Sequence, residues 1–254
     1  MKITTFIILC ITMISSMTAF AQPQVIAHRG YWKTNGSAQN SIRSLVKADS
    51  INCYGSEFDV WMTIDGELVV NHDAKVDNFI IEQSESADIL SIKLDNGENI
   101  SSLKQYLEEG QNCKTRLIFE LKPHVNKILE AKAAIESIML VNKMGLSNRV
   151  EYITFSPEAL YLLIKYAPQG TPVYYLNGDK TPQELHKMGA AGMDYHYSIL
   201  KKYPEWIEEC HNLGMKVNAW TVNKEEDMIW CIKHNIDFIT TNEPELLQNL
   251  LLSK

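Results

Sequence analysis

The sequence is short of basic residues. Lys and Arg together number 24 against 31 Asp and Glu in 254 residues, which gives a formal net charge of -7 at pH 7. Binding to nucleic acid without sequence preference depends on clustered positive charge that neutralises the phosphates. This charge balance argues against a nucleic-acid partner, and an anionic substrate would need cations supplied locally by its site.

The sequence also lacks the short patterns that mark several common protein classes. It contains no internal repeat, run of like charges or heptad pattern, and no Gly-x-Gly-x-x-Gly motif follows the first predicted strand. Without heptads nothing indicates a coiled-coil partner, and the oligomeric state stays open. Without the glycine motif a doubly wound dinucleotide-binding sheet is disfavoured.

Cysteine is sparse, and its spacing is uninformative. Cys10 lies in the N-terminal apolar run, and Cys53, Cys113, Cys210 and Cys231 match no zinc-ligand spacing. Buried or unpaired thiols are the simplest expectation in a domain of this size. An oxidising compartment would permit disulfides, and a bridge between Cys210 and Cys231 is then the least disfavoured pairing.

Only one long apolar run occurs, at the N-terminus. Lys2 precedes the mostly apolar residues 3–20, and Ala19-Phe20-Ala21 has the small-x-small pattern of a signal-peptidase site. We expect residues 1–21 to be a cleaved secretory signal, which places the mature protein in the periplasm or outside the cell with no stable membrane anchor. The alternative is a membrane anchor, but the run is short for a spanning helix of about 20 residues.

The remaining chain, 22–254, alternates short apolar runs with amphipathic stretches, as repeated strand-helix units do. Strands are predicted at 25–27, 55–61, 116–121, 150–155, 172–176, 192–195, 216–221 and 237–240. Helices are predicted at 41–50, 101–111, 127–144, 157–166, 182–188, 203–212, 224–234 and 244–252. Eight such units in one domain predict an α/β fold, a (β/α)₈ TIM barrel, with an open doubly wound sheet as the runner-up.

One stretch, residues 74–100, fits neither a strand nor a helix cleanly. It follows the second strand and the short extended piece after it. An excursion of this length is uncommon in a compact domain unless it is functional or loosely packed. We therefore expect a short insertion that either caps the mouth of the barrel or lies loosely on its surface.

Polar residues gather where the first strands of the predicted barrel end. In TIM barrels these C-terminal strand ends line the active-site mouth, and side chains two apart on a strand share a face. The candidates are His28 and Arg29 after the first strand, Glu57 and Asp59 in the second, His72 after the extended piece, and Glu120 and Lys122 in the third. All seven are expected to converge on one cavity.

The chemistry of this set favours a metal-dependent reaction on a phosphodiester. Glu57, Asp59 and Glu120 would repel one another unless a cation neutralised them, and carboxylate oxygens suit Ca²⁺ or Mg²⁺. Two histidines can share general base and general acid duties near neutral pH. Cations such as Arg29 and Lys122 hold phosphoryl oxygens. Any one of the three acids, taken alone, could instead be a structural carboxylate held in a salt bridge. We expect the other histidines to have structural roles: His124, His186, His196, His211 and His234.

An ordered series of motifs runs along nearly all of the mature chain. It comprises Ala27-His28-Arg29-Gly30, Gln39-Asn40-Ser41, Glu57-Phe58-Asp59-Val60, Thr63-Ile64-Asp65-Gly66, Val69-Val70-Asn71-His72-Asp73, Phe119-Glu120-Leu121-Lys122, Ala219-Trp220-Thr221-Val222-Asn223 and Thr241-Asn242-Glu243-Pro244. In this series the sequence resembles the glycerophosphodiester phosphodiesterases. Gln39 and Asn242 depart from it, because the family usually has an acid at each position.

The resemblance implies a TIM barrel that hydrolyses a small-molecule glycerophosphodiester to sn-glycerol 3-phosphate and an alcohol with a divalent cation. It implies His28 and His72 as catalytic residues, which we assign as base and acid in that order. It implies Glu57, Asp59 and Glu120 as metal ligands and Arg29 and Lys122 as phosphate-binding residues. Trp220 is a candidate wall for the glycerol side of the pocket or, equally, a core-capping aromatic.

Three alternative functions stay open from the sequence. A lysophospholipid or sphingolipid phosphodiesterase of the same superfamily would need an apolar ramp at the mouth, for which residues 79–81 and 89–90 are candidates. A barrel that has lost catalysis would serve as a binding module, although it would be expected to lack some of the site residues. A glycoside hydrolase could use Glu57 and Glu120 but would not need the histidines and Arg29 together.

Overall fold

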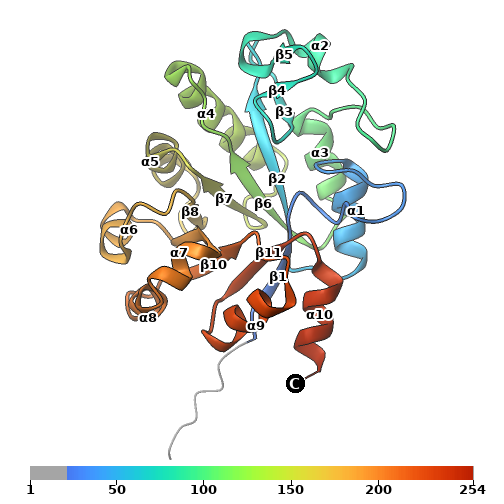
Figure 1. Ribbon diagram of the computed structural model, residues 1–254. Coiled ribbons are helices and arrows are strands. Elements are labelled where there is room, and N and C mark those ends of the chain that lie inside the picture. The colour runs from blue at the N-terminus through green and yellow to red at the C-terminus, as the bar shows by residue number, and fades with distance from the viewer. Residues whose placement is uncertain (1–21, 254) are drawn as a thin grey trace, which may run out of the picture.

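The computed structural model describes residues 22–253, so the predicted signal at 1–21 lies outside the described residues (Figure 1). Eight parallel strands form the central sheet: β1 (Gln24–Ala27), β2 (Gly55–Met62), β6 (Arg116–Leu121), β7 (Val150–Thr154), β8 (Val173–Tyr175), β9 (Gly192–His196), β10 (Lys216–Trp220) and β11 (Phe238–Thr241). The sheet closes because β1 pairs in parallel with both β2 and β11. This closure confirms the predicted (β/α)₈ barrel and rules out the open sheet.

Helices alternate with the strands and surround the barrel (Figure 1). They are α1 (Ile42–Ser50), α3 (Leu103–Gly110), α4 (Lys127–Lys143), α5 (Pro157–Tyr166), α6 (Pro182–Met188), α7 (Tyr197–Lys202), α8 (Glu205–Asn212), α9 (Glu225–Lys233) and α10 (Pro244–Leu252). All eight predicted strands and helices are present, with ends that agree to within one or two residues. The short α7, which the sequence pattern did not reveal, begins at the end of β9 and is capped by His196.

Side chains alternate between two cores because successive residues of a strand face opposite sides of the sheet. The larger core lies between the strands and the helices, where Val217 and Ala219 of β10 pack with Met193 and Tyr195 of β9. The smaller core fills the barrel and consists of Ile26, Ile118, Ile153, Tyr174, Leu176 and Phe238. Polar residues in the inward-facing register therefore end up inside the barrel.

The insertion after β2 is a folded unit with its own apolar core. It follows β3 (Leu68–Val70), which pairs antiparallel with β2, and comprises the hairpin β4 (Lys75–Val76) and β5 (Phe79–Ile80), the 3₁₀ turn η1 (Ile81–Gln83) and α2 (Ser86–Leu90). Ile81 and Ile89 are fully buried with Trp61, Val69 and Ile100. The expectation of a loosely packed excursion is therefore wrong, and Ile81 and Ile89 cannot form part of an exposed lipid ramp.

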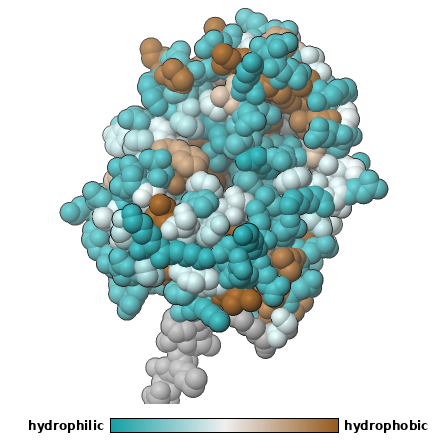
Figure 2. Space-filling view, in the orientation of Figure 1, coloured by the Kyte–Doolittle hydropathy of each residue, from teal (hydrophilic) through white to brown (hydrophobic). Residues whose placement is uncertain are grey.

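Apolar side chains do reach solvent beside this insertion. Ile64, Val125 and Ile128 are 57%, 88% and 85% exposed, and Ile80 of β5 is 41% exposed. Figure 2 shows apolar atoms over the insertion and the neighbouring end of α4 on an otherwise largely hydrophilic face. Within residues 22–253 no helix has the length and apolar character needed to cross a bilayer.

The four cysteines of the described residues are free and buried, so the least disfavoured pairing, Cys210 with Cys231, is not formed. Burial raises the pKa of both these thiols to about 12. A thiol with such a pKa remains protonated near neutral pH and is a poor nucleophile. The cysteines therefore behave as small apolar core residues.

Gly192 at the start of β9 allows the close approach of β10. A Cβ built at this position would lie 1.9 Å from the backbone oxygen of Lys216. Because the clash is with a backbone atom, no side-chain movement can relieve it. We predict that Gly192→Ala lowers the free energy of unfolding by about 3 kcal/mol or more, as severe overpacking does. Chemical denaturation measures this change.

Gly110→Ala is the matched control. Its Cβ would meet only the flexible Leu117 side chain, at 3.1 Å, and alanine favours helix over glycine. The control should stay within about 1 kcal/mol of wild type. Equal stability of the two variants would show that β9 and β10 can separate without cost.

Candidate active site

A small cavity opens at the C-terminal end of the barrel strands. Its volume is about 90 Å³, and its lining consists of His28, Arg29, Glu57, His72, Glu120, Lys122, Ile153, Phe155, Leu176, Asp194, Trp220, Thr221 and Thr240. Seven of the eight predicted site residues are among them; the eighth, Asp59, is buried directly behind Arg29 and Lys122.

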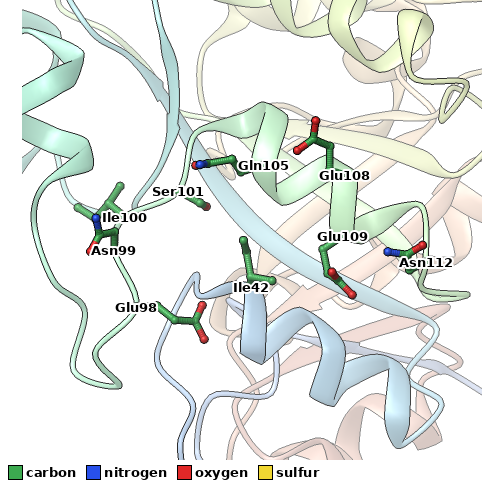
Figure 3. A pocket seen from close by; sticks show the side chains of 9 residues that line it. All are labelled: Ile42, Glu98, Asn99, Ile100, Ser101, Gln105, Glu108, Glu109 and Asn112. Atoms are coloured by element: carbon green, nitrogen blue, oxygen red, sulfur yellow. The ribbon is translucent and has the colours of Figure 1, made fainter.

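A larger groove of about 480 Å³ lies outside the barrel between α1, α3 and the insertion (Figure 3). Glu98, Glu108 and Glu109 contribute its acidic groups, and Ile42 of α1 is among its lining residues. None of the predicted site residues lines this groove. The chemistry that the sequence predicts is therefore gathered in the cavity at the barrel mouth.

The first strand delivers His28 and Arg29 through an unusually tight turn. Arg29 and Gly30 both adopt left-handed backbone conformations, with φ of 57° and 75°. A Cβ on Gly30 would approach backbone and side-chain atoms of Ser44 to within 2.3–2.7 Å, so only glycine fits there. This turn directs the Arg29 backbone N–H to Glu57 Oε2, at 2.8 Å.

Glu57, Asp59 and Glu120 converge as the strand register requires. Glu57 and Asp59 share the inner face of β2, and Asp59 pairs in register with Glu120 of β6. Each residue offers one carboxylate oxygen, and these oxygens lie within 4.8 Å of one another. All three side chains are buried, and Glu57 Oε1 has no hydrogen-bond partner in the described structure. This donor set fits a hard divalent cation.

Two cations partly offset these acids. Lys122 Nζ lies 2.7 Å from Glu120 Oε1 and 3.2 Å from Asp59 Oδ1, while Arg29 Nε lies 3.8 Å from Asp59 Oδ2. Burial alone would lower the pKa of Lys122, but Asp59 and Glu120 raise it, so the ammonium stays charged. With all groups ionised, three carboxylates face two cations, which leaves one excess negative charge.

The excess charge falls unevenly on the acids. Burial, together with Asp59 and Glu120, raises the pKa of Glu57 well above its ordinary value. Burial also raises the pKa of Glu120 to about 7, even though Lys122 is adjacent. For Asp59 burial acts upward as well, but Lys122, His72 and a hydrogen bond from Asn40 lower its pKa to about 2. A further cation bound beside Glu57 and Glu120 would lower the pKa values of both carboxyl groups and so favour their ionised forms.

Asn40 orients Asp59 from the loop before α1. Its Nδ2 donates to Asp59 Oδ2 at 2.8 Å, and its Oδ1 accepts from the Asp59 backbone N–H at 3.1 Å. Gln39, which stands where the resembling family has an acid, accepts from the Arg29 guanidinium at 2.5 Å. The substituted position thus still holds Arg29, through a neutral amide.

His28 is oriented by Asn242, which follows β11. The Nδ1 atom of His28 lies 2.8 Å from Asn242 Oδ1, and the Trp32 indole N–H donates to the same oxygen at 3.2 Å. Because an indole can only donate, the amide oxygen faces both partners, and His28 Nδ1 carries the hydrogen. His28 Nε2, 3.9 Å from Glu57 Oε2, is then free of a proton. Burial and Arg29 lower the pKa of His28 to about 4.

His72 reaches the cavity from the loop after β3. Its Nδ1 lies 2.7 Å from Asp73 Oδ1, and its backbone carbonyl accepts from the Trp61 indole at 3.1 Å. Burial lowers the pKa of His72, while Asp59 and Asp73 act in the opposite direction. The two cavity histidines thus differ in their partners: an amide holds one and a carboxylate holds the other.

The opposite side of the cavity is apolar on its wall and polar on its floor. Trp220 at the end of β10 stands edge-on to Phe155 with ring centroids 5.6 Å apart, and its indole donates to the Asp194 carbonyl at 2.8 Å. Ile153 and Leu176 complete the wall, and the Asp194 and Thr240 side chains form the floor. Trp220 therefore lines the pocket, one of the two placements that its position allowed.

Several residues of the site were not predicted from the sequence. Asn40 and Asn242 position Asp59 and His28, and Asp194 and Thr240 line the cavity. Asn242 directly follows a barrel strand, so the strand-end argument could have found it. Asp194 and Thr240 are polar residues within apolar strands, which was the available signal.

His124, in contrast, has the structural role expected for it. Its Nδ1 lies 2.8 Å from the Lys122 carbonyl, and its Nε2 accepts from the Met62 backbone N–H at 2.9 Å. The ring thereby joins the ends of β2 and β6 beneath Lys122. It is not among the residues that line the cavity.

Comparisons with known proteins identify the family of this chain. The model of the glycerophosphoryl diester phosphodiesterase family matches residues 28–246. A glycerophosphodiester phosphodiesterase from Caldanaerobacter subterraneus subsp. tengcongensis is 30% identical over 243 residues, which cover 89% of this chain and 97% of that protein.

Solved structures resemble the whole barrel. The crystal structure of a glycerophosphodiester phosphodiesterase from Parabacteroides distasonis has a TM-score of 0.90 and 45% identity, and the match covers 91% of this chain and 98% of that one. An Oleispira antarctica phosphodiesterase, solved in complex with the product sn-glycerol-3-phosphate, shares the fold at a TM-score of 0.76 and 23% identity over 91% and 97% of the two chains. With the family model and the 30% identical relative, these matches show that the chain belongs to the glycerophosphoryl diester phosphodiesterase family, whose members are phosphoric diester hydrolases.

Proposed function

We propose that the protein hydrolyses glycerophosphodiesters to sn-glycerol 3-phosphate and an alcohol, with one divalent cation, Ca²⁺ or Mg²⁺, held by Glu57, Asp59 and Glu120. The observation that carries this proposal is the shared cavity in which buried carboxylates meet two histidines. The unpartnered Glu57 oxygen and the excess negative charge both favour a cation at that point. When bound, such a cation polarises the phosphoryl group and stabilises charge that develops on it.

The hydrogen bonds of the histidines favour His28 as the base and His72 as the acid. Asn242 and Trp32 fix the hydrogen of His28 on Nδ1, which leaves Nε2 free to accept a proton from the attacking hydroxyl group. Asp73 beside His72 favours the imidazolium form, which can deliver a proton to the departing alcohol oxygen. Different partners thus prepare two chemically identical rings for opposite tasks.

In this proposal Arg29 and Lys122 bind the phosphoryl oxygens. Both line the cavity beside the carboxylates, and Lys122 remains charged because two of those acids flank it. Charge-assisted hydrogen bonds of this kind hold an anionic phosphodiester against the negative net charge of the protein. The site thereby supplies the local cations that the overall composition lacks.

A second candidate is a lysophospholipid phosphodiesterase that uses the same chemistry. The observation that favours it is the exposed group of Ile64, Ile80, Val125 and Ile128 near the ends of β2 and β6. An acyl chain could rest on such a surface while the headgroup enters the cavity. Activity that grows with acyl-chain length would favour this candidate.

The first prediction concerns reaction and metal together. The purified protein should release sn-glycerol 3-phosphate from glycerophosphoethanolamine with Ca²⁺ or Mg²⁺, and chelator should abolish the release. Glu57→Gln should weaken metal binding by about 100-fold or more, because it removes a charged ligand. Titration calorimetry with each metal separately measures this binding.

Glu151→Gln is the matched control, since Glu151 is also buried inside the barrel but pairs with Arg116 and does not line the cavity. It should bind the metal as wild type does. Release that persists in chelator would contradict the metal proposal. Release from a lysophospholipid alone would move the assignment to the second candidate.

The second prediction separates the two histidines. His28→Ala and His72→Ala should each lower kcat by about 10²- to 10⁴-fold, as loss of general base or acid does. A glycerophosphodiester of 4-nitrophenol needs no proton on its leaving group. This substrate should therefore restore much of the activity of His72→Ala and none of that of His28→Ala.

His234→Gln, on α9's C-terminal side and outside the cavity lining, should retain wild-type turnover and serves as the control. If either alanine variant kept more than about a tenth of wild-type turnover on glycerophosphoethanolamine, that histidine would not be a general acid or base. Restoration of His28→Ala instead of His72→Ala would reverse the assigned order.

We also propose that residues 1–21 are a cleaved signal and that the mature protein, 22–254, acts in the periplasm or outside the cell. Every barrel strand begins at Gln24 or later, so cleavage after Ala21 leaves the barrel complete. Full-length protein made in a bacterial host should be recovered outside the cytoplasm with Gln22 at its N-terminus, as mass spectrometry can show. An intact N-terminus in the membrane fraction would instead support the anchor.

A further inference from the structure

The floor of the cavity carries a carboxyl group that the proposed reaction does not use. Asp194 lies in the middle of β9, is 2% exposed and contributes to the cavity lining. Its Oδ1 has no hydrogen-bond partner in the described structure. A buried polar oxygen without a partner is unfavourable, and a bound group that donates a hydrogen bond would satisfy it.

A hydroxyl group accompanies this oxygen. Asn218 of β10, in register with Asp194, donates from Nδ2 to Thr240 Oγ1 at 2.8 Å. Thr240 thus accepts a hydrogen bond, and its own hydroxyl hydrogen remains available to donate. Because Thr240 also lines the cavity, the floor presents a donor beside an acceptor.

A paired donor and acceptor selects one kind of ligand group. A phosphate oxygen can only accept, and an ammonium can only donate, so neither uses both partners. A hydroxyl group donates and accepts at once.

The position of this pair relates it to the reaction centre. Asp194 comes from β9, which lies across the closed barrel from β2, the strand of Glu57, whereas Thr240 comes from β11, which pairs with β1, the strand that leads to His28. The apolar side chains of Phe155, Leu176 and Trp220 line the same cavity. The cavity of about 90 Å³ is well below the roughly 300 Å³ of typical ligand pockets, so only a small part of a substrate enters it.

We propose that Asp194 and Thr240 bind a hydroxyl group of the polyol carried by the phosphodiester and thereby determine that a hydroxylated moiety is held next to the reacting phosphorus. This inference rests on the proposed function for the placement of the phosphoryl group. The carbon atoms of the polyol pack on the apolar wall, while its hydroxyl donates to Asp194 and accepts from Thr240. Loss of either the Asp194 carboxyl or the Thr240 hydroxyl leaves the ligand hydroxyl group with only one of its two hydrogen bonds.

Binding of two small ligands tests this proposal independently of turnover. Titration calorimetry with the metal-loaded protein compares sn-glycerol 3-phosphate with n-propyl phosphate, which has the same length and phosphate but lacks both hydroxyls. Wild type should bind sn-glycerol 3-phosphate at least about 10-fold more tightly, since one hydrogen bond contributes about 3- to 10-fold. Asp194→Ala should weaken this ligand by about 10-fold and leave n-propyl phosphate unchanged.

Thr240→Val is a second, nearly isosteric variant that removes only the hydroxyl group. Like Asp194→Ala, it should reduce the preference for sn-glycerol 3-phosphate over n-propyl phosphate. Asp194→Asn retains an acceptor oxygen and should therefore keep at least part of the preference for sn-glycerol 3-phosphate. Glu151→Gln, a buried acid of the same barrel interior outside the cavity, is the matched control and should keep the full preference. Thermal unfolding of each variant establishes that it is folded.

The outcomes separate this inference from the proposed function. If Asp194→Ala and Thr240→Val weaken both ligands equally or neither ligand, the hydroxyl-binding role is overturned even where wild type hydrolyses glycerophosphoethanolamine. If wild type fails to hydrolyse that substrate but the variants abolish its preference for sn-glycerol 3-phosphate, the hydroxyl-binding role holds and the proposed reaction fails.

Discussion

The mutual repulsion of Glu57, Asp59 and Glu120 is the constraint on which the rest of the site depends. One oxygen of each lies within 4.8 Å of the others, and all three side chains are buried. Like charges at this separation in a weakly polarisable interior are strongly unfavourable. Lys122 and Arg29 offset two of the three charges, and a third charge remains. A divalent cation would both remove this excess and leave the mouth positive toward an anionic substrate.

The supporting contacts follow from the same constraint. Asn40 and the Arg29 backbone N–H each donate to a carboxylate, and both residues adopt left-handed backbone conformations to do so. Such conformations are unfavourable for residues with a side chain and persist where surrounding contacts fix them. His124 joins the ends of β2 and β6 beneath Lys122 without lining the cavity. The loops around the acids are thus ordered by the charges that they hold.

Most of the fold and the chemical centre could be predicted from the sequence because both depend on local pattern. Strand boundaries agree to within one residue, since apolar runs end at Gly, Pro, Asn or Asp. The acids, the histidines and the cations were found because polar residues at strand ends are unexpected in an apolar barrel. Asn40 and Asn242 stand in the quoted motifs, but their roles as partners of Asp59 and His28 depend on contacts 19 and 214 residues distant in the chain, which the local pattern does not show. The fold of 74–100 was missed because its elements are two to five residues long and gain stability only from the shared core around Trp61.

Asn242 stands where the family usually has an acid, so the two proposed catalytic histidines have different hydrogen-bond partners: an amide for His28 and a carboxylate for His72. A carboxylate at that position would stabilise protonated His28 and so raise its pKa. The amide accepts the same hydrogen bond without a full charge, which fixes the ring while leaving it neutral. Asp73 supplies that charge to His72 instead. The departure from the family pattern is therefore compatible with the proposed roles: the neutral amide holds His28 beside the buried acids, and the carboxylate holds the more exposed His72.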